Sequence, residues 1–308
     1  MSEALLPASL QVLERGWLSS NNILGFEGET AALIDSGYVS HAAQTVALVE
    51  RALDGRTLSR LINTHAHSDH IGGNAALQAS FGCAVIVPAG AAAKIAEWDD
   101  AALLLSPLGQ RGARFQHDRL LAAGDEFEFG GLNWRAIAVP GHDMDALAFH
   151  NPEKRLLISG DALWRDGFGV IFSELLDHPA EGSGFAMTRA TLDQLASLSV
   201  DVVIPGHGAS FADVDDAFER AYRRLAAFEQ STERLARHAL KVILAFALLE
   251  RRRLARRELP DFLAGLSFAQ SVNARFLGYD DAALAEWLSS DLIRAGALRE
   301  EDGVLVAV

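Results

Sequence analysis

The segment Thr64–His70, with the sequence THAHSDH, places four residues that commonly bind metals within six positions. In an extended segment, side chains two residues apart point to the same side, so His65 and His67 can bind one ion together. Asp69 and His70 follow where the chain must turn toward two glycines, and they face elsewhere. Imidazole nitrogens and carboxylate oxygens suit Zn²⁺, Fe or Mn²⁺. The segment therefore predicts one pair of ligands for each of two ions.

Three further fragments share one pattern, in which a short apolar strand ends in a tight turn that carries a ligand. They are Pro140-Gly141-His142, Gly160-Asp161 and Pro205-Gly206-His207. If these strands lie beside the strand that precedes His65, all the ligands meet at one edge, where rigid scaffolds often place reactive groups. Half of the ten histidines fall in such fragments, which favours a metal site over isolated solvated histidines. An aspartate has two oxygens and can bridge two cations.

The elements that must position these residues alternate along the first two thirds of the chain. Strands are expected at 10–18, 22–26, 31–35, 60–63, 84–87, 134–139, 147–150, 156–159 and 202–204. Helices are expected between them, at 41–53, 74–81, 90–98 and 185–197. Strands separated by helices predict a layered α/β fold.

The pattern becomes helical after Gly208. Helical periodicity runs through 213–257, Pro260 is expected to break it, and two further helices are expected near 262–276 and 282–295. Asp302-Gly303 between apolar stretches predicts a terminal hairpin. Helices followed by a hairpin predict a small helical, winged-helix-like domain at 211–308, after a catalytic domain at 1–210.

The composition describes an ordinary globular protein, with 308 residues of which 50% are hydrophobic and 22% charged. A net charge of −14 disfavours nucleic-acid binding. The basic run Arg251–Arg257 is either a solvated helix end or an anion-binding patch. No apolar stretch reaches the ~18 residues of a membrane helix, and no signal peptide is evident, which predicts a cytoplasmic protein. Cys83 is the single cysteine, which excludes an intrachain disulfide and a Cys-rich zinc site.

The motif at 64–70 and the later His, Asp and His resemble the metallo-β-lactamase superfamily, whose motif is THxHxDH. The resemblance covers about 10–210 and is closest to its glyoxalase II and lactamase-β-2-like branch. It implies a four-layer αβ/βα sandwich that binds two divalent metal ions. Zinc is the expected metal, and Fe and Mn are the alternatives. The resemblance also implies the ligands: His65, His67 and His142 for one ion, Asp69, His70 and His207 for the second, and Asp161 bridging both.

One departure from the family concerns the third motif. Many members continue it as PGHTxG, whereas this chain has Asp143-Met144-Asp145 after His142. The ligand is retained and the small residues after it are replaced. The departure therefore bears on the substrate side more than on the metals.

The function implied is hydrolysis of a small thioester, ester or lactone by a metal-bound hydroxide, with Asp69 orienting that hydroxide. The alternatives are a metal-dependent nuclease or phosphodiesterase, an iron-dependent oxidoreductase of the persulfide dioxygenase type, and a binding protein that has lost catalysis. The expected partner is a small-molecule substrate. Membrane association is not expected, and nucleic-acid binding is disfavoured. A homo-oligomer remains open.

Aromatic residues after Asp161 could line a substrate pocket, or they could pack in the core. These residues are Trp164, Phe168 and Phe172, with His178 further downstream. Four histidines without ligand-like neighbours are expected to be structural or exposed, namely His41, His117, His150 and His238. Cys83 is expected at a buried strand start and not as a nucleophile.

Overall fold

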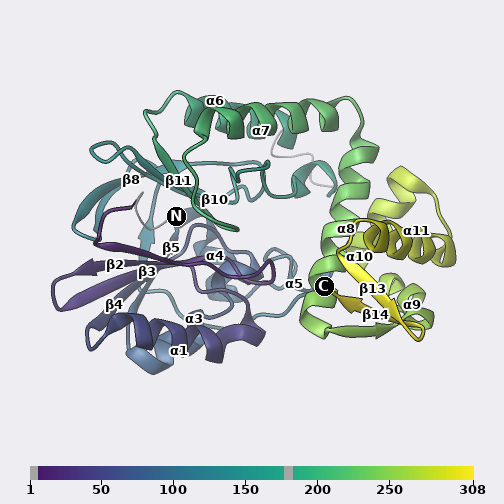
Figure 1. Cartoon of the computed structure of the whole chain (residues 1–308), viewed down its shortest axis with the longest axis horizontal. Helices are drawn as coiled ribbons and strands as arrows, with labels where there is room; N and C mark the ends of the chain where they lie inside the picture. Colours follow the sequence, from purple (N-terminus) through teal and green to yellow (C-terminus); the bar gives the residue numbers. More distant parts are fainter. Residues whose placement is uncertain (1–5, 177–182) are drawn as a thin grey trace.

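Two β-sheets packed face to face form the centre of the first two thirds of the chain, at the left in Figure 1, and the carboxyl-terminal helices lie beside them at the right. The computed structural model describes residues 6–176 and 183–308. In these residues the first sheet has six strands, and its four strands from β3 to β6 run parallel to one another. They are β1 Leu10–Leu13, β2 Asn22–Glu27, β3 Thr30–Ile34, β4 Thr57–Ile62, β5 Ala84–Pro88 and β6 Arg119–Leu121.

The second sheet has the order β11-β10-β9-β8-β7 within the described residues. Only its β10–β11 pair is parallel. The strands are β7 Glu126–Phe129, β8 Leu132–Ala138, β9 Leu147–Asn151, β10 Leu156–Gly160 and β11 Val202–Pro205. Strands β9 and β10 are buried along their whole length, and both begin with an apolar run in the sequence, Leu147–Phe149 and Leu156–Ile158.

Three apolar cores separate the layers. The inner core lies between the sheets and contains Ile34 and Ile62 from the first and Phe149 and Ile158 from the second. Helices α1 (Ala42–Leu53) and α3 (Asn74–Phe81) cover the outer face of the first sheet, whereas α6 (Gly184–Ala196) and α7 (Val214–Glu229) lie on the opposite side of the molecule (Figure 1). The expected four-layer αβ/βα arrangement is confirmed.

Three strands were not expected, namely β6, β7 and β12 (Arg253–Ala255), and the first predicted strand is shorter than 10–18 because it ends at Leu13. Strands β6 and β12 have only three residues, and the four side chains of β7 alternate between exposed and at least partly buried, so none of these strands forms a long apolar run. Pro260 is also not the residue that ends the helical run, which stops at Arg251. Pro260 lies in the first turn of α9 (Leu259–Ala264), where its missing N–H costs no hydrogen bond.

The carboxyl-terminal region is mainly helical, as expected. Its elements are α8 Thr232–Arg251, α9, α10 Ser267–Val272, a π-helix Asn273–Leu277, α11 Asp281–Arg294, and a small sheet of β12 Arg253–Ala255, β13 Leu298–Glu301 and β14 Val304–Ala307. One apolar core continues from the second sheet into these helices. The boundary at residue 210 and the winged-helix class of this region stay predictions.

The basic run at 251–257 is partly neutralised. Arg256 pairs with Glu286 and Glu300, and Arg253 pairs with Glu301 at 3.3 Å. These contacts favour a paired surface over an anion-binding patch. Cys83 is buried, as expected, and its burial raises the pKa of the thiol to about 11. No helix among the described residues is long and apolar enough to cross a membrane.

Glu250 connects the carboxyl-terminal helix α8 to the first half of the chain. Its carboxylate accepts hydrogen bonds from Tyr38 Oη at 2.9 Å and from Arg111 Nε at 2.7 Å, and its side chain is 10% exposed. Glu250→Ala leaves both donors without this acceptor, so we expect it to lower the free energy of unfolding by about 2 kcal/mol.

The urea midpoint of unfolding measures this effect. Glu233→Ala is the matched control, because Glu233 lies on the same helix and pairs with Arg237 in solvent. A surface pair of that kind is worth about 0.3–0.5 kcal/mol. Equal shifts in the two variants would contradict the connecting role of Glu250.

Candidate metal centre

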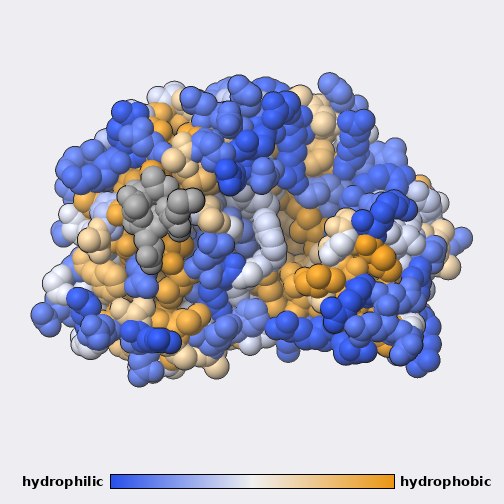
Figure 2. Space-filling model, in the orientation of Figure 1, coloured by the Kyte–Doolittle hydropathy of each residue, from blue (hydrophilic) through white to orange (hydrophobic). Residues whose placement is uncertain are grey.

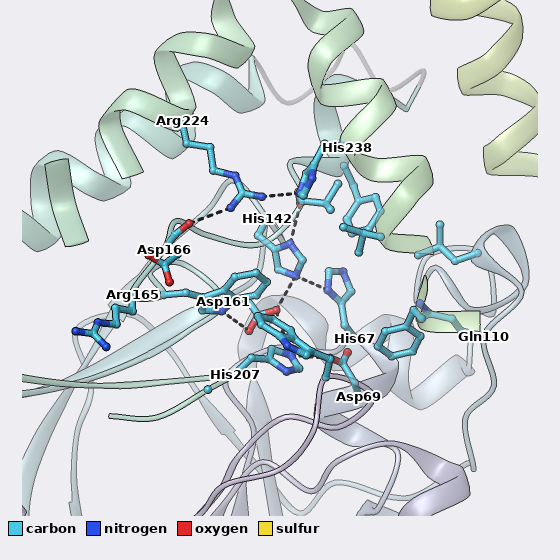
Figure 3. Close-up of a pocket in the computed structure, with 18 of the residues that line it drawn as sticks. His67, Asp69, Gln110, His142, Asp161, Arg165, Asp166, His207, Arg224 and His238 are labelled. Atoms are coloured by element: carbon cyan, nitrogen blue, oxygen red, sulfur yellow. Dashed lines mark hydrogen bonds and ion pairs between the residues drawn. The ribbon is translucent and has the colours of Figure 1, made fainter. Parts of the chain in front are cut away.

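Four strands deliver the seven predicted ligands to one edge of the sheet system. The chain leaves β4 at Ile62, runs extended through His65 and His67, and enters the short helix α2 (Ser68–Ile71). The other three ligands follow β8, β10 and β11, and all lie close together (Figure 3). Gly206 permits one close approach, because a Cβ at this position would lie 2.2 Å from Asp161 Oδ1.

The seven side chains form two groups of potential metal ligands. One contains His65, His67 and His142; the other contains Asp69, His70, Asp161 and His207. Within each group, the donor atoms lie within 4.8 Å of one another. The division follows the expectation from the 65–70 segment, in which the two histidines of the extended part face one ion and the next two residues face another.

Hydrogen bonds fix the orientation of three imidazoles. Nδ1 of His65 lies 3.1 Å from Thr64 Oγ1, Nδ1 of His70 lies 2.8 Å from Asp35 Oδ2, and Nδ1 of His142 lies 2.7 Å from the Val170 carbonyl oxygen. Because Thr64 Oγ1 donates its hydrogen to Asp35, it accepts from His65. Each ring therefore carries its hydrogen on Nδ1 and presents the lone pair of Nε2 to the centre, as metal-binding histidines do.

Buried nitrogens without partners point to what these groups bind. His65 Nε2, His70 Nε2 and His207 Nδ1 are buried and have no hydrogen-bond partner among the described residues. Buried polar atoms are almost always satisfied, so three such atoms in one cluster require an explanation. Divalent metal ions at this centre would satisfy His65 Nε2 and His70 Nε2, and a donor set of imidazoles and carboxylates suits such ions.

Asp161 lies between the two groups. Its Oδ1 is 3.4 Å from His70 Nε2, and its Oδ2 is 3.5 Å from His142 Nε2. Oδ1 thus faces the second group, and Oδ2 lies between the two groups, since it is also 3.8 Å from His207 Nε2. This is the position that a bridging ligand requires. Trp164 holds this carboxylate by donating from its indole N–H to Oδ1 at 3.2 Å.

The electrostatics of the centre favour the metal-binding forms of His65, His67 and Asp161. Burial, reinforced by neighbouring imidazoles, lowers the pKa of His65 well below its usual value and that of His67 to about 3. Burial disfavours charge on Asp161, but His70 and His207 outweigh it and hold the pKa of Asp161 well below its usual range. His65 and His67 are therefore neutral and Asp161 is ionised at neutral pH, as metal binding requires. Burial disfavours charge on His70, but Asp161, Asp35 and Asp69 outweigh it and raise the pKa of this imidazole, so a metal ion there would displace a proton.

The departure from the family motif after His142 is explained by Lys94. Its ammonium group lies 3.4 Å from Asp143 Oδ2 and 3.0 Å from Asp145 Oδ2. Asp143 Oδ2 also lies 3.9 Å from His67 Nε2, and Asp143 and Asp145 do not line the cavity. The expectation that this departure bears on the substrate side is therefore wrong, because Asp143 sits behind a metal ligand. Burial opposes ionisation of Asp143, but the charge of Lys94 outweighs it and lowers its pKa to about 2.

Beside the centre lies a cavity of about 550 Å³, a volume typical of small-molecule sites. Trp164 and Phe172 line it, as expected, and Phe172 contacts the rings of His67 and His142. Phe168 does not line it. Phe168 is 2% exposed and packs in the core against Phe228. Of the two expectations for this residue, pocket lining or core packing, the structure shows core packing.

Several residues of the site had no distinct signal in the sequence. Trp17 stacks on His207 with ring centroids 5.4 Å apart, although it precedes His207 by most of the domain. Asp35 supports both Thr64 and His70. It follows strand β3 directly, so the pattern of a strand ending in a carboxylate could have identified it.

The remaining histidines have different environments. His41 and His150 make hydrogen bonds, to Ser19 Oγ at 2.9 Å and to the Ser199 carbonyl at 3.3 Å, as expected for structural residues. His238 was expected to be structural or exposed, but it lies on α8 and lines the cavity. His117 is not in either ligand group. His178 lies outside the described residues.

Comparisons with known proteins agree with this geometry. The profile described as the metallo-beta-lactamase superfamily matches residues 15–207. Hydroxyacylglutathione hydrolase of Hyphomonas neptunium is 34% identical over 132 residues, which cover 43% of this chain and 44% of that protein. The protein of the same name from Brucella anthropi is 31% identical over 193 residues, with 60% and 64% covered. The chain thus spans about half the length of the curated relatives it matches.

Solved structures share the fold at lower identity. The metallo-beta-lactamase family protein TTHA1429 from Thermus thermophilus is 22% identical with a TM-score of 0.60, and the alignment covers 99% of this chain and 100% of that one. The BLEG-1 B3 metallo-beta-lactamase is 21% identical with a TM-score of 0.56, and 68% and 96% are covered. The matched profile includes all seven ligand positions and more than half of the chain, and the chain therefore belongs to the metallo-beta-lactamase superfamily.

Proposed function

We propose that this protein is a hydrolase that uses two divalent metal ions, most suitably zinc, to cleave a small thioester, ester or lactone. The observation that carries the proposal is the anchoring of His65, His70 and His142 through Nδ1, which leaves each Nε2 directed into the centre. Curated relatives named hydroxyacylglutathione hydrolase support acyl hydrolysis as the reaction.

The two ligand groups assign the ions. His65, His67 and His142 would hold one, and Asp69, His70 and His207 would hold the other, with Asp161 shared between them. When bound, two divalent ions supply an acidified water molecule as nucleophile and a Lewis acid for the acyl oxygen.

We assign to Asp69 the role of orienting the attacking water and accepting its proton. Its carboxylate lines the cavity, and its Oδ2 accepts a hydrogen bond from His207 Nε2 at 3.0 Å. Histidines lower its pKa although burial opposes them, so it is ionised and can accept a hydrogen bond from water. Trp17 and Trp164 pack around His207, with centroid distances of 5.4 and 5.5 Å, and cover its ring.

The cavity favours a small substrate with an apolar part over a nucleic acid. Its walls are largely apolar, with Val170, Phe172 and Phe246 among the lining residues. A single-stranded nucleic acid would need a basic groove with stacking platforms, whereas this chain carries a net charge of −14. A small substrate with an apolar part fits these walls.

Metal quantification followed by a substrate panel tests the proposal. We expect about two zinc ions per chain in freshly purified protein and turnover of thioesters or lactones that stops when the metals are chelated. One redox-active iron with oxygen consumption on a persulfide would instead indicate an oxidoreductase. Phosphodiester cleavage without thioester or lactone cleavage would indicate a nuclease, and either result overturns the proposal.

A further inference from the structure

Arg224 of α7 is a half-buried cation in the cavity wall. Its guanidinium donates one hydrogen bond to the Asp166 carbonyl oxygen at 3.1 Å and another to His238 Nε2 at 2.7 Å. No described carboxylate forms an ion pair with it, and the Asp166 carboxylate pairs with Arg220 at 3.3 Å. A guanidinium has five N–H donors, so most of its hydrogen-bonding capacity is unused by the described residues.

Two aromatic rings lie against this guanidinium, where their faces stabilise its charge but offer its unused N–H groups no hydrogen-bond acceptor of the carboxylate kind. Its carbon atom lies 5.8 Å from the ring centroid of Phe168 and 5.7 Å from that of Phe228. Burial lowers the pKa of Arg224, although the nearby Asp166 carboxylate acts in the opposite direction. A partly desolvated charge without a counter-ion is unfavourable, and an anion in the cavity would remove this penalty.

His238 extends the same site without adding charge. Because its Nε2 accepts from Arg224, the ring hydrogen is on Nδ1, which makes His238 a neutral donor. Burial and then the charge of Arg224 lower its pKa to about 3, so the ring stays neutral at physiological pH. The ring stacks on Phe228 with centroids 5.6 Å apart, which fixes its orientation. The Arg224–His238 pair therefore carries one positive charge.

The pair lies at one end of the cavity and Asp69 and His207 lie at the other, with His142 between them. Figure 3 shows Arg224 and His238 on the side of the α7 and α8 helices, and Asp69 and His207 on the opposite side. Much of the remaining wall is apolar and includes Leu108, Val170, Phe172, Val242 and Phe246. Hydrophobic residues also gather in the hollow beside α8 on the face shown in Figure 2.

We propose that Arg224 and His238 bind a carboxylate at the end of the substrate remote from the bond that is cleaved. The single positive charge favours a monoanion, and the planar guanidinium matches a carboxylate through two parallel hydrogen bonds. The preferred substrate is then a thioester or ester whose apolar chain ends in a carboxylate. This substrate class rests on the proposed hydrolase function, whereas the binding of a monoanion does not.

Calorimetry of hexanesulfonate binding to the metal-loaded protein tests the site without turnover. Sulfonate is a monoanion that coordinates divalent metals weakly, so it probes the arginine and not the metal centre. We expect hexanesulfonate to bind more tightly than hexanol, and Arg224→Met to weaken its binding about tenfold, equivalent to about 1.4 kcal/mol. Arg224→Lys keeps the charge and is expected to retain part of the affinity.

Arg223→Met is the matched control, because Arg223 is the preceding residue on α7 and lies in solvent beside Glu219. We expect it to change hexanesulfonate binding by less than about twofold. Equal losses in the Arg223 and Arg224 variants, or unchanged binding in Arg224→Met, would overturn the site.

Kinetics on two matched thioesters tests the substrate class. The aryl thioester of adipic acid carries a terminal carboxylate, and that of hexanoic acid has the same chain length without it. We expect the wild type to prefer the adipoyl compound about tenfold in kcat/KM, and Arg224→Met to remove the preference through KM with kcat little changed. If Arg224 only supports the Asp166 loop, both substrates will lose activity equally.

The two experiments separate the two proposals. If no thioester is turned over but hexanesulfonate binding depends on Arg224, the hydrolase proposal fails and the anion site stands. If thioesters are hydrolysed but the adipoyl preference survives Arg224→Met, the anion site fails and the hydrolase stands.

Discussion

Replacing His67 or Asp161 by alanine is expected to abolish hydrolysis and leave a soluble, folded protein. His67 completes one ligand group, and Asp161 is the carboxylate that faces both. Removing a residue that only hydrogen-bonds to a metal ligand already costs about 10–100-fold in metal affinity or activity. The loss of a ligand is therefore expected to cost at least about a hundredfold in kcat/KM, and neither side chain is part of the apolar cores that stabilise the layers.

Activity assays, metal content and circular dichroism of each variant check this expectation together. His117→Ala is the control, since His117 belongs to neither ligand group and its loss should leave metal content unchanged. Wild-type turnover by either variant after treatment with a chelator would show that the reaction does not depend on this centre.

The ligand-bearing strands could be predicted because each combines two local signals. An apolar run such as Leu156–Ser159 predicts a buried strand, and the Gly-Asp turn that follows predicts where it ends. Local patterns also locate the helices well: α3 follows Gly73 and ends at Gly82, which adopts φ +64° as a helix cap. The convergence of the strand ends follows from the sheet order, which the family motif implies and the sequence pattern alone does not.

The residues behind and around the ligands are harder to predict, because their roles depend on contacts between distant segments. Lys94 meets Asp143 across 49 positions of the sequence, and no local period encodes that pairing. Helical periodicity places His238 on α8 but does not say which layer this helix face meets. The same limit explains Phe168, since an aromatic residue in a loop can turn either to a cavity or to the core.

The largest effect outside the ligands is expected for Asp35→Asn. Asp35 Oδ1 accepts from the Thr64 backbone N–H at 2.9 Å, and Oδ2 accepts from Thr64 Oγ1 at 2.8 Å and from His70 Nδ1 at 2.8 Å. Both oxygens are acceptors, so an amide cannot replace them. If the new NH₂ group faces His70 Nδ1, the ring must move its hydrogen to Nε2, the nitrogen that a metal would bind.

We therefore expect Asp35→Asn to weaken metal binding about 10–100-fold and to lower the free energy of unfolding of the metal-free protein by about 1–3 kcal/mol. Metal retention against graded chelator concentrations measures the first effect, and urea unfolding of the chelated protein measures the second. Asp118→Asn is the control, because Asp118 also accepts a backbone N–H, that of Val85 at 2.8 Å, but belongs to neither ligand group. If Asp35→Asn retains its metals as firmly as Asp118→Asn does, then the hydrogen bond to Nδ1 does not determine which nitrogen of His70 is free to bind.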